Sequence, residues 1–170
     1  MQPTPGNPQS AVISLVRMDI RNFSFGGTAA VVTSLGLIIG LDAAAASRAT
    51  IVGGLLIVAI TDNLTDSLSI HMYQESERLD ALKAFRATLI NFATRLGLSL
   101  SFVVLMILLP LRIALIVSSI WALLLLAGLT YVVARGRGQP VIPELLKHLV
   151  AAVAVLVASK AIGHLIVLQT

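Results

Sequence analysis

Residues 51–70 read IVGGLLIVAITDNLTDSLSI, an apolar run long enough to cross a bilayer as one helix. Its second half carries two carboxylates, Asp62 and Asp66. Four residues is about one helical turn, so both acids share one helix face. A charge at bilayer depth costs about 2.5–3.5 kcal/mol on insertion scales, and such residues are commonly functional. The segment therefore predicts a membrane helix with a functional carboxylate pair.

The whole chain has the composition of a membrane protein. It has 170 residues, of which 57% are hydrophobic and 12% charged, with a mean hydropathy of +0.95. Cysteine is absent, which excludes disulfides and thiolate chemistry. The net charge of +4 comes from basic residues scattered beside apolar blocks, so it indicates membrane topology and no nucleic-acid partner. There is no phosphate-binding glycine loop and no catalytic constellation, so we expect no enzyme.

The apolar blocks predict an all-α integral membrane bundle. Residues 1–10 are rich in proline and glycine and are expected to be a disordered tail, while residues 11–170 form one membrane domain. Just after the tail, an amphipathic helix is expected to lie at the interface and to lead into the first span. The five transmembrane spans are expected at about residues 26–46, 51–70, 87–109, 113–134 and 144–167.

Basic residues beside the spans predict the orientation. Eight of them fall on the side of the N-terminus: Arg17, Arg21, Arg78, Lys83, Arg86, Arg135, Arg137 and Lys147. Two, Arg48 and Arg112, fall on the other side. Because cytoplasmic loops carry the excess of Lys and Arg, the N-terminus is predicted to be cytoplasmic and the C-terminus to lie on the opposite side.

Two interpretations of the acid pair remain open. In the first, Asp62 and Asp66 bind a divalent metal ion, with Asn63, Thr61 and Thr65 adding oxygen ligands. One helix offers few ligands, and a two-fold homodimer that apposes this helix would double them. In the second, the acids pair with Lys160 or His164 of the last span and only hold the bundle together.

An intermediate case combines these interpretations: a carboxylate alternates between Lys160 and a cation or proton, so that Lys160 and His164 serve as counter-ion or proton relay. Arg95 in the third span offers two further alternatives. Its side chain either reaches the lipid headgroups or turns inward towards Asp66.

A second group of metal-ligating types follows the acid pair. His71, Met72 and Glu75 stand where the second span leaves the membrane, and His71 and Glu75 share a face. They form a candidate entry or release site for a transition metal. The alternative is a solvated helix end in which neighbouring charges neutralise one another.

Three stretches of the chain, taken together, resemble one known family. They read RNFSFGGTAAVVTSLGLIIG (residues 21–40), GLLIVAITDNLTDSLSIHMYQESE (residues 54–77) and GQPVIPELLKHLVAAVAVLVASKAIGHLI (residues 138–166). In order, spacing and number of spans they are similar to the vacuolar iron transporter family, whose members are five-span dimeric carriers of ferrous and related divalent metals. The resemblance implies a homodimer in the lipid bilayer that moves a divalent metal such as iron or manganese and holds no resident cofactor.

The chain also departs from that family's pattern. Ala29 stands where the family has the metal-binding Asp of its first span, and Thr28 stands where it has Asn. Asp66 matches the family's second-span Glu, whereas Asp62 replaces a Met. The long metal-binding insert of the family is reduced to a short connection. The expected function is transport of divalent metal cations, coupled to protons; the alternative is a non-transporting scaffold or partner-binding protein with the same fold.

Overall fold

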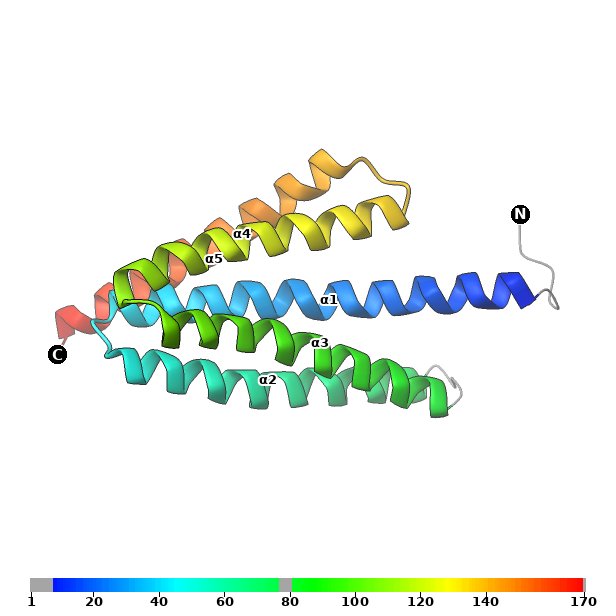
Figure 1. Ribbon diagram of the computed structural model, residues 1–170, viewed down its shortest axis with the longest axis horizontal. Helices are drawn as coiled ribbons and strands as arrows, with labels where there is room; N and C mark the ends of the chain where they lie inside the picture. Colours follow the sequence, from blue (N-terminus) through cyan, green and yellow to red (C-terminus); the bar gives the residue numbers. More distant parts are fainter. Residues whose placement is uncertain (1–7, 77–80, 170) are drawn as a thin grey trace.

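The chain folds into five helices joined by short connections, as the computed structural model shows for residues 8–76 and 81–169 (Figure 1). The helices are α1 (Pro8–Ala43), α2 (Arg48–Ser76), α3 (Ala81–Leu108), α4 (Leu111–Gly136) and α5 (Val141–Gln169). Each contains a segment that is long and apolar enough to cross a membrane. The all-α prediction with five such helices is therefore confirmed, and the helices suggest a multi-pass membrane protein.

The start of the chain differs from the prediction. We expected a separate interfacial helix before the first span, but α1 runs without a break from Pro8 to Ala43. No proline follows Pro8 in this helix, and glycines such as Gly26 and Gly27 lower helix stability by only about 1 kcal/mol each. Residues 1–7 of the predicted tail lie outside the described residues, whereas residues 8–10 already belong to α1.

Helix α1 lies between two helical hairpins. Figure 1 shows α2 and α3 on one side of it and α4 and α5 on the other, and α1 packs against all four. Helix α2 packs mainly on α3, and α5 packs on α1 and α4. The beginning of α1 and the end of α5 lie at opposite ends of the bundle. The hairpin α2–α3 is thus the unit that contains the acid pair.

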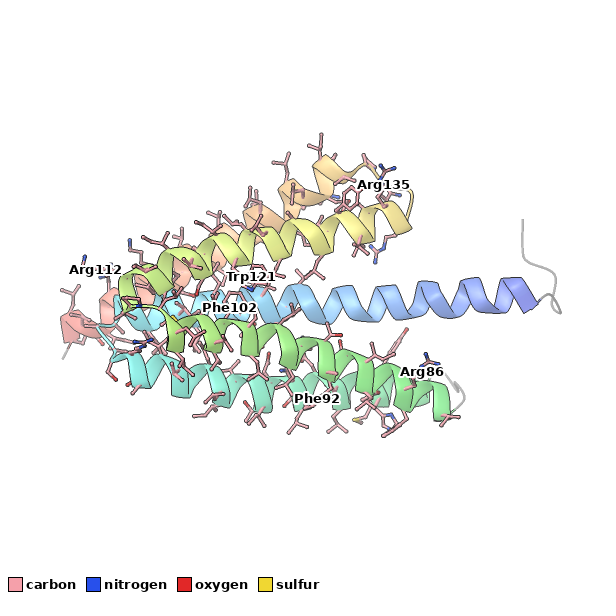
Figure 2. The ribbon with its side chains drawn as sticks, viewed as in Figure 1. Arg86, Phe92, Phe102, Arg112, Trp121 and Arg135 are labelled. Atoms are coloured by element: carbon pink, nitrogen blue, oxygen red, sulfur yellow. The ribbon has the colours of Figure 1, made fainter. Side chains whose placement is uncertain are left out.

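The basic side chains are divided between the two ends of the bundle. Arg86 and Arg135 lie near the α2–α3 and α4–α5 connections, and Arg112 lies at the other end (Figure 2). This division matches the grouping that the sequence indicated. Which end faces the cytoplasm remains a prediction.

Small residues allow α1 and α5 to approach closely. Gly36 and Gly40 of α1 lie against Ser159, and a Cβ atom at Gly163 would overlap the carbonyl oxygen of Gly40 and the side chain of Ala43. Close backbone packing of this kind holds helices together where the hydrophobic effect is absent. It fixes α5 on α1, on the far side from α2.

The turn after α1 fixes where α2 begins. The backbone N–H of Ala46 donates to the carbonyl of Leu41 at 2.9 Å, and that of Ala45 donates to Asp42 at 2.9 Å, which is a Schellman termination. Ala45 has φ +56, a left-handed conformation that favours glycine. The first span therefore ends at Ala43, three residues before the predicted boundary at 46.

Arg48 fastens the beginning of α2 to the end of α3. Its Nε atom donates to the carbonyl of Met106 at 2.6 Å and its Nη2 atom to that of Leu109 at 2.8 Å, with a further bond to Ile107. The carbonyls of Met106 and Ile107 belong to the last turn of α3 and that of Leu109 follows it, at a helix end where a cation is favoured by the helix dipole. The contact sets the register of the hairpin from one end.

Candidate functional site

Arg95 of α3 is the centre of a buried polar cluster. Its guanidinium lies 2.7 Å from Oδ2 of Asp62 and 2.6 Å from Oδ2 of Asp66. Its Nε atom donates to Oδ1 of Asn63 at 2.8 Å, and Nη1 donates to the carbonyl of Gly26 at 3.4 Å. One side chain thus connects α3 to both acids of α2 and to the backbone of α1.

The geometry follows from helix periodicity and from the shape of the guanidinium. Asp62 and Asp66 are one turn apart on α2, with Asn63 beside them, so all three reach the same point on α3. Arginine has five N–H donors in a planar fork and can bind two carboxylates and an amide oxygen together. A lysine ammonium is a single compact charge and does not match this arrangement. The cluster therefore requires arginine at position 95.

Burial differs sharply between the base and the acids. The side chain of Arg95 is 1% exposed, whereas those of Asp62 and Asp66 are 40% and 36% exposed. Breaking a buried ion pair commonly costs about 3–5 kcal/mol, because an uncompensated charge remains in the interior. The arginine lies in the core, and the carboxylates reach the outer surface of the hairpin.

The formal charges of the cluster do not cancel. Two carboxylates carry two negative charges and one guanidinium carries one positive charge, which leaves one negative charge. This excess is found beside the surface of α2, where the acids are partly exposed.

Glycine at position 26 permits the cluster to form. A Cβ atom there would overlap the amide oxygen of Asn91 and lie 3.0 Å from Cγ of Arg95. Asn91 is fully buried, and neither its Oδ1 nor its Nδ2 atom has a hydrogen-bond partner among the described residues. Gly26 thus lets the backbone of α1 approach both polar side chains of α3.

The hydroxyl groups expected to assist the acids lie on another face of α2. Thr61 and Thr65 are exposed, and each donates a hydrogen bond to the carbonyl four residues earlier, at 2.8 and 2.9 Å. Ser69 does the same at 2.9 Å. Asn63 is buried and is committed to Arg95 and to the carbonyl of Ala59. Of the oxygen ligands that we expected around the acids, the structure brings only Asn63 into the cluster.

The second predicted metal site lies only partly within the described residues. His71 is half-buried, Met72 is 62% exposed, and the side chain of Glu75 lies outside the described part of the structure. Within the described residues, no three His, Asp or Glu side chains are close enough together to hold a metal ion. The proposed entry site at this helix end therefore stays a prediction.

Lys160 is not the counter-ion of the acids. It is exposed on α5, as is His164, and α5 packs on α1 and α4 while the acids belong to the α2–α3 hairpin. Both carboxylates pair with Arg95 instead. Of the two alternatives for Arg95, the inward orientation is the one found, and it reaches Asp62 as well as Asp66.

A signal for this pairing is present in the sequence. Helices α2 and α3 form an antiparallel hairpin, and Asp62, Asp66 and Arg95 are at similar distances from the connection near residues 77–80. Asn91 lies one turn from Arg95 on the same helix and carries no charge, so it gave no comparable signal.

The fold and the cluster describe a five-helix protein whose helices are long enough to cross a membrane. One of its hairpins, α2–α3, carries an ion-pair cluster near its middle. No family model, no curated protein and no solved structure matches the chain. The resemblance to the vacuolar iron transporter family therefore remains a prediction.

Proposed function

We propose that the protein is a multi-pass integral membrane carrier of cations, with divalent metals as its cargo class and Asp62 and Asp66 as the cation-binding residues. Five helices of spanning length support the membrane placement. The acids lie near the middle of α2, which spans Arg48–Ser76, and so at a depth where charged side chains generally serve a function.

The second carboxylate is the observation that carries this proposal. One buried arginine is neutralised by one carboxylate, so either Asp62 or Asp66 would suffice to tie α2 to α3. The other acid adds a negative charge that hydrocarbon does not compensate. A site that binds and releases a cation explains why both are present.

The shortest contacts with Arg95 run through the Oδ2 atom of each carboxylate. A further cation would therefore approach through the Oδ1 atoms, from the exposed side of α2. Carboxylate oxygens suit hard divalent cations, which take several oxygen ligands at once. Proton exchange at the same acids would couple cation movement to a proton gradient.

The exposed sides of the acids also support a homodimer. Lipid tails offer no partner to a carboxylate that is more than a third exposed, so a second copy of the chain is proposed to cover this face of α2. A two-fold axis there would bring four carboxylates together and provide the ligands that one chain lacks.

A non-transporting scaffold is the second candidate. Two observations favour it. All three guanidinium nitrogens of Arg95 already contact oxygen atoms of the protein. The described residues also provide no third acidic or imidazole ligand beside the acids. In this case the cluster serves only to fasten α2 to α3.

Flux of ferrous, manganous and zinc ions into proteoliposomes tests the carrier. The matched control is Glu144→Gln, which removes a carboxylate from the exposed pair of Glu144 with Lys147. We expect Asp62→Asn and Asp66→Asn to lose flux and Glu144→Gln to retain it. If the unmutated protein moves none of these ions with or without a proton gradient, the carrier proposal is wrong and the scaffold function is preferred. If flux is present and neither Asp variant changes it, the binding residues are wrongly assigned.

A further inference from the structure

The contact between α2 and α3 changes character along its length. Towards the Arg48 end, Ile51 and Leu55 of α2 and Phe102 and Met106 of α3 are fully buried and belong to the apolar core. Towards the α2–α3 connection, the buried residues are polar: Asn63 and Ser67 on α2, and Asn91 and Arg95 on α3. We call this second half the polar seam.

Ser67 and Asn91 lie at the same level of the polar seam. The two helices run antiparallel, and Arg95 bonds to Asn63 at 2.8 Å. One turn further towards the connection brings α2 to Ser67 and α3 to Asn91. Asn91 and Ser67 therefore occupy matching positions on the two helices, and the amide oxygen of Asn91 lies beside Gly26 of α1.

These two side chains contain three buried polar atoms without a hydrogen-bond partner in the part of the chain that the structure describes: Oδ1 and Nδ2 of Asn91 and Oγ of Ser67. Asn63 behaves differently, since its amide donates to the carbonyl of Ala59 and accepts from Arg95. Buried amides and hydroxyls are rarely left unpaired, and internal water commonly supplies the missing partners. A water site needs two to four polar partners, and the seam supplies three at one level.

We propose that the polar seam binds internal water and forms a hydrated path along the hairpin from the level of His71 to Arg95. His71 lies one turn beyond Ser67 and marks the outer end of this path. The water at Ser67 and Asn91 connects it to the guanidinium and so to the acids. This inference rests on the proposed membrane placement, but a hydrated seam is present whether or not a cation is transported.

Silver ion, which is close to water in size and reacts with thiols, provides the test. Because the chain has no cysteine, each single-cysteine variant carries one reporter thiol. Protein in liposomes is exposed to silver ion, unfolded, and then labelled with a maleimide. Ser67→Cys places the thiol in the seam, and we expect silver to abolish its maleimide labelling.

Two control variants separate a hydrated seam from other causes of reactivity. Ser118→Cys is on α4 and fully buried, and the replaced hydroxyl also lacks a partner, but it lies between the core residues Ala114 and Ala122. Ala93→Cys is exposed on α3, two residues from Asn91 and at the same depth. We expect both to keep full maleimide labelling after silver treatment.

Two further variants complete the design. Asn91→Leu in the Ser67→Cys background fills the seam with an apolar group of similar size, and we expect it to restore maleimide labelling. Asn91→Cys reports on the same space from α3 and replaces Ser67→Cys if that variant does not fold. Full labelling of the seam cysteine after silver treatment overturns the proposal. Equal loss of labelling at Ser118→Cys or Ala93→Cys, or continued loss in the Asn91→Leu double variant, also overturns it.

Discussion

The Nη2 atom of Arg95 lies 2.7 Å from Oδ2 of Asp62, and this contact joins α3 to α2 across 33 positions of sequence. The same guanidinium holds Asp66 one helical turn away. The base is enclosed by the protein and the acids are not. Variants of the base and of the acids should therefore have different consequences.

Arg95→Ala is expected to destabilise the protein by about 1–3 kcal/mol, because it leaves buried Asn63 and two partly exposed carboxylates without their partner. Arg95→Lys should restore only part of this loss, since an ammonium cannot span both acids and Asn63. Thermal unfolding in detergent micelles, followed by circular dichroism, measures the effect. Arg86→Ala removes an exposed arginine near the α2–α3 connection (Figure 2) and should change stability by less than about 0.5 kcal/mol. An Arg95→Ala variant as stable as the parent would show that the cluster does not hold the hairpin together.

The losses of stability caused by substituting the two acids are expected to be non-additive. Asp62→Asn or Asp66→Asn alone leaves one carboxylate on Arg95, so each should cost much less than Arg95→Ala. The double variant leaves an unpaired arginine in the core and should lose more stability than the two single losses together. A double-mutant cycle of unfolding temperatures measures this coupling. Simple additivity would mean that the acids do not share Arg95.

Gly26→Ala is expected to lower stability, although alanine favours helix more than glycine does. The added Cβ would overlap the amide oxygen of Asn91 and crowd the side chain of Arg95, and both are buried. Gly97→Ala, on the helix that carries Arg95, meets no atom within 4 Å and should be neutral or stabilising. Comparing the unfolding temperatures of the two variants separates the packing effect from helix propensity. A Gly26→Ala variant at least as stable as Gly97→Ala would contradict this packing.

Ala45→Gly is expected to stabilise the protein by about 1 kcal/mol, since Ala45 has a left-handed backbone at φ +56 that costs a non-glycine residue about 1–2 kcal/mol. The Schellman hydrogen bonds are made by the backbone and remain in the variant. Ala44→Gly is the control, because its backbone is not left-handed and glycine there only adds freedom to the unfolded chain. Thermal unfolding should place Ala45→Gly above the parent and Ala44→Gly at or below it. The reverse order would exclude this turn geometry.

The five helices could be predicted from the sequence because apolar runs of spanning length have few alternative structures. Their ends were harder to predict. The predicted start of α1 was wrong because charges at helical spacing are found both in separate surface helices and in extensions of a membrane span. Only the absence of a helix-breaking residue distinguishes the two cases.

Within the site, the acids were recognisable because charge in an apolar segment is rare. Their partner was harder to identify, since Lys160 and Arg95 both lie in apolar spans. The similar distances of the acids and Arg95 from the α2–α3 connection favour Arg95 only once these two helices are known to pair. The structure places α5 across α1 from the hairpin, which removes Lys160 and leaves Arg95. Asn91 and Ser67 gave no sequence signal, because buried amides and hydroxyls are common in helices that pack through small and polar residues.

The central position of α1 has a consequence for the order in which the protein can assemble. Helix α1 is made first, yet the surface around Gly36 and Gly40 is covered by α5, the last of the five helices to be synthesised. The α2–α3 hairpin can close earlier, because Arg48 and Arg95 find their partners within it. A chain that ended after α4 would therefore have a closed charge cluster and an uncovered glycine surface on α1.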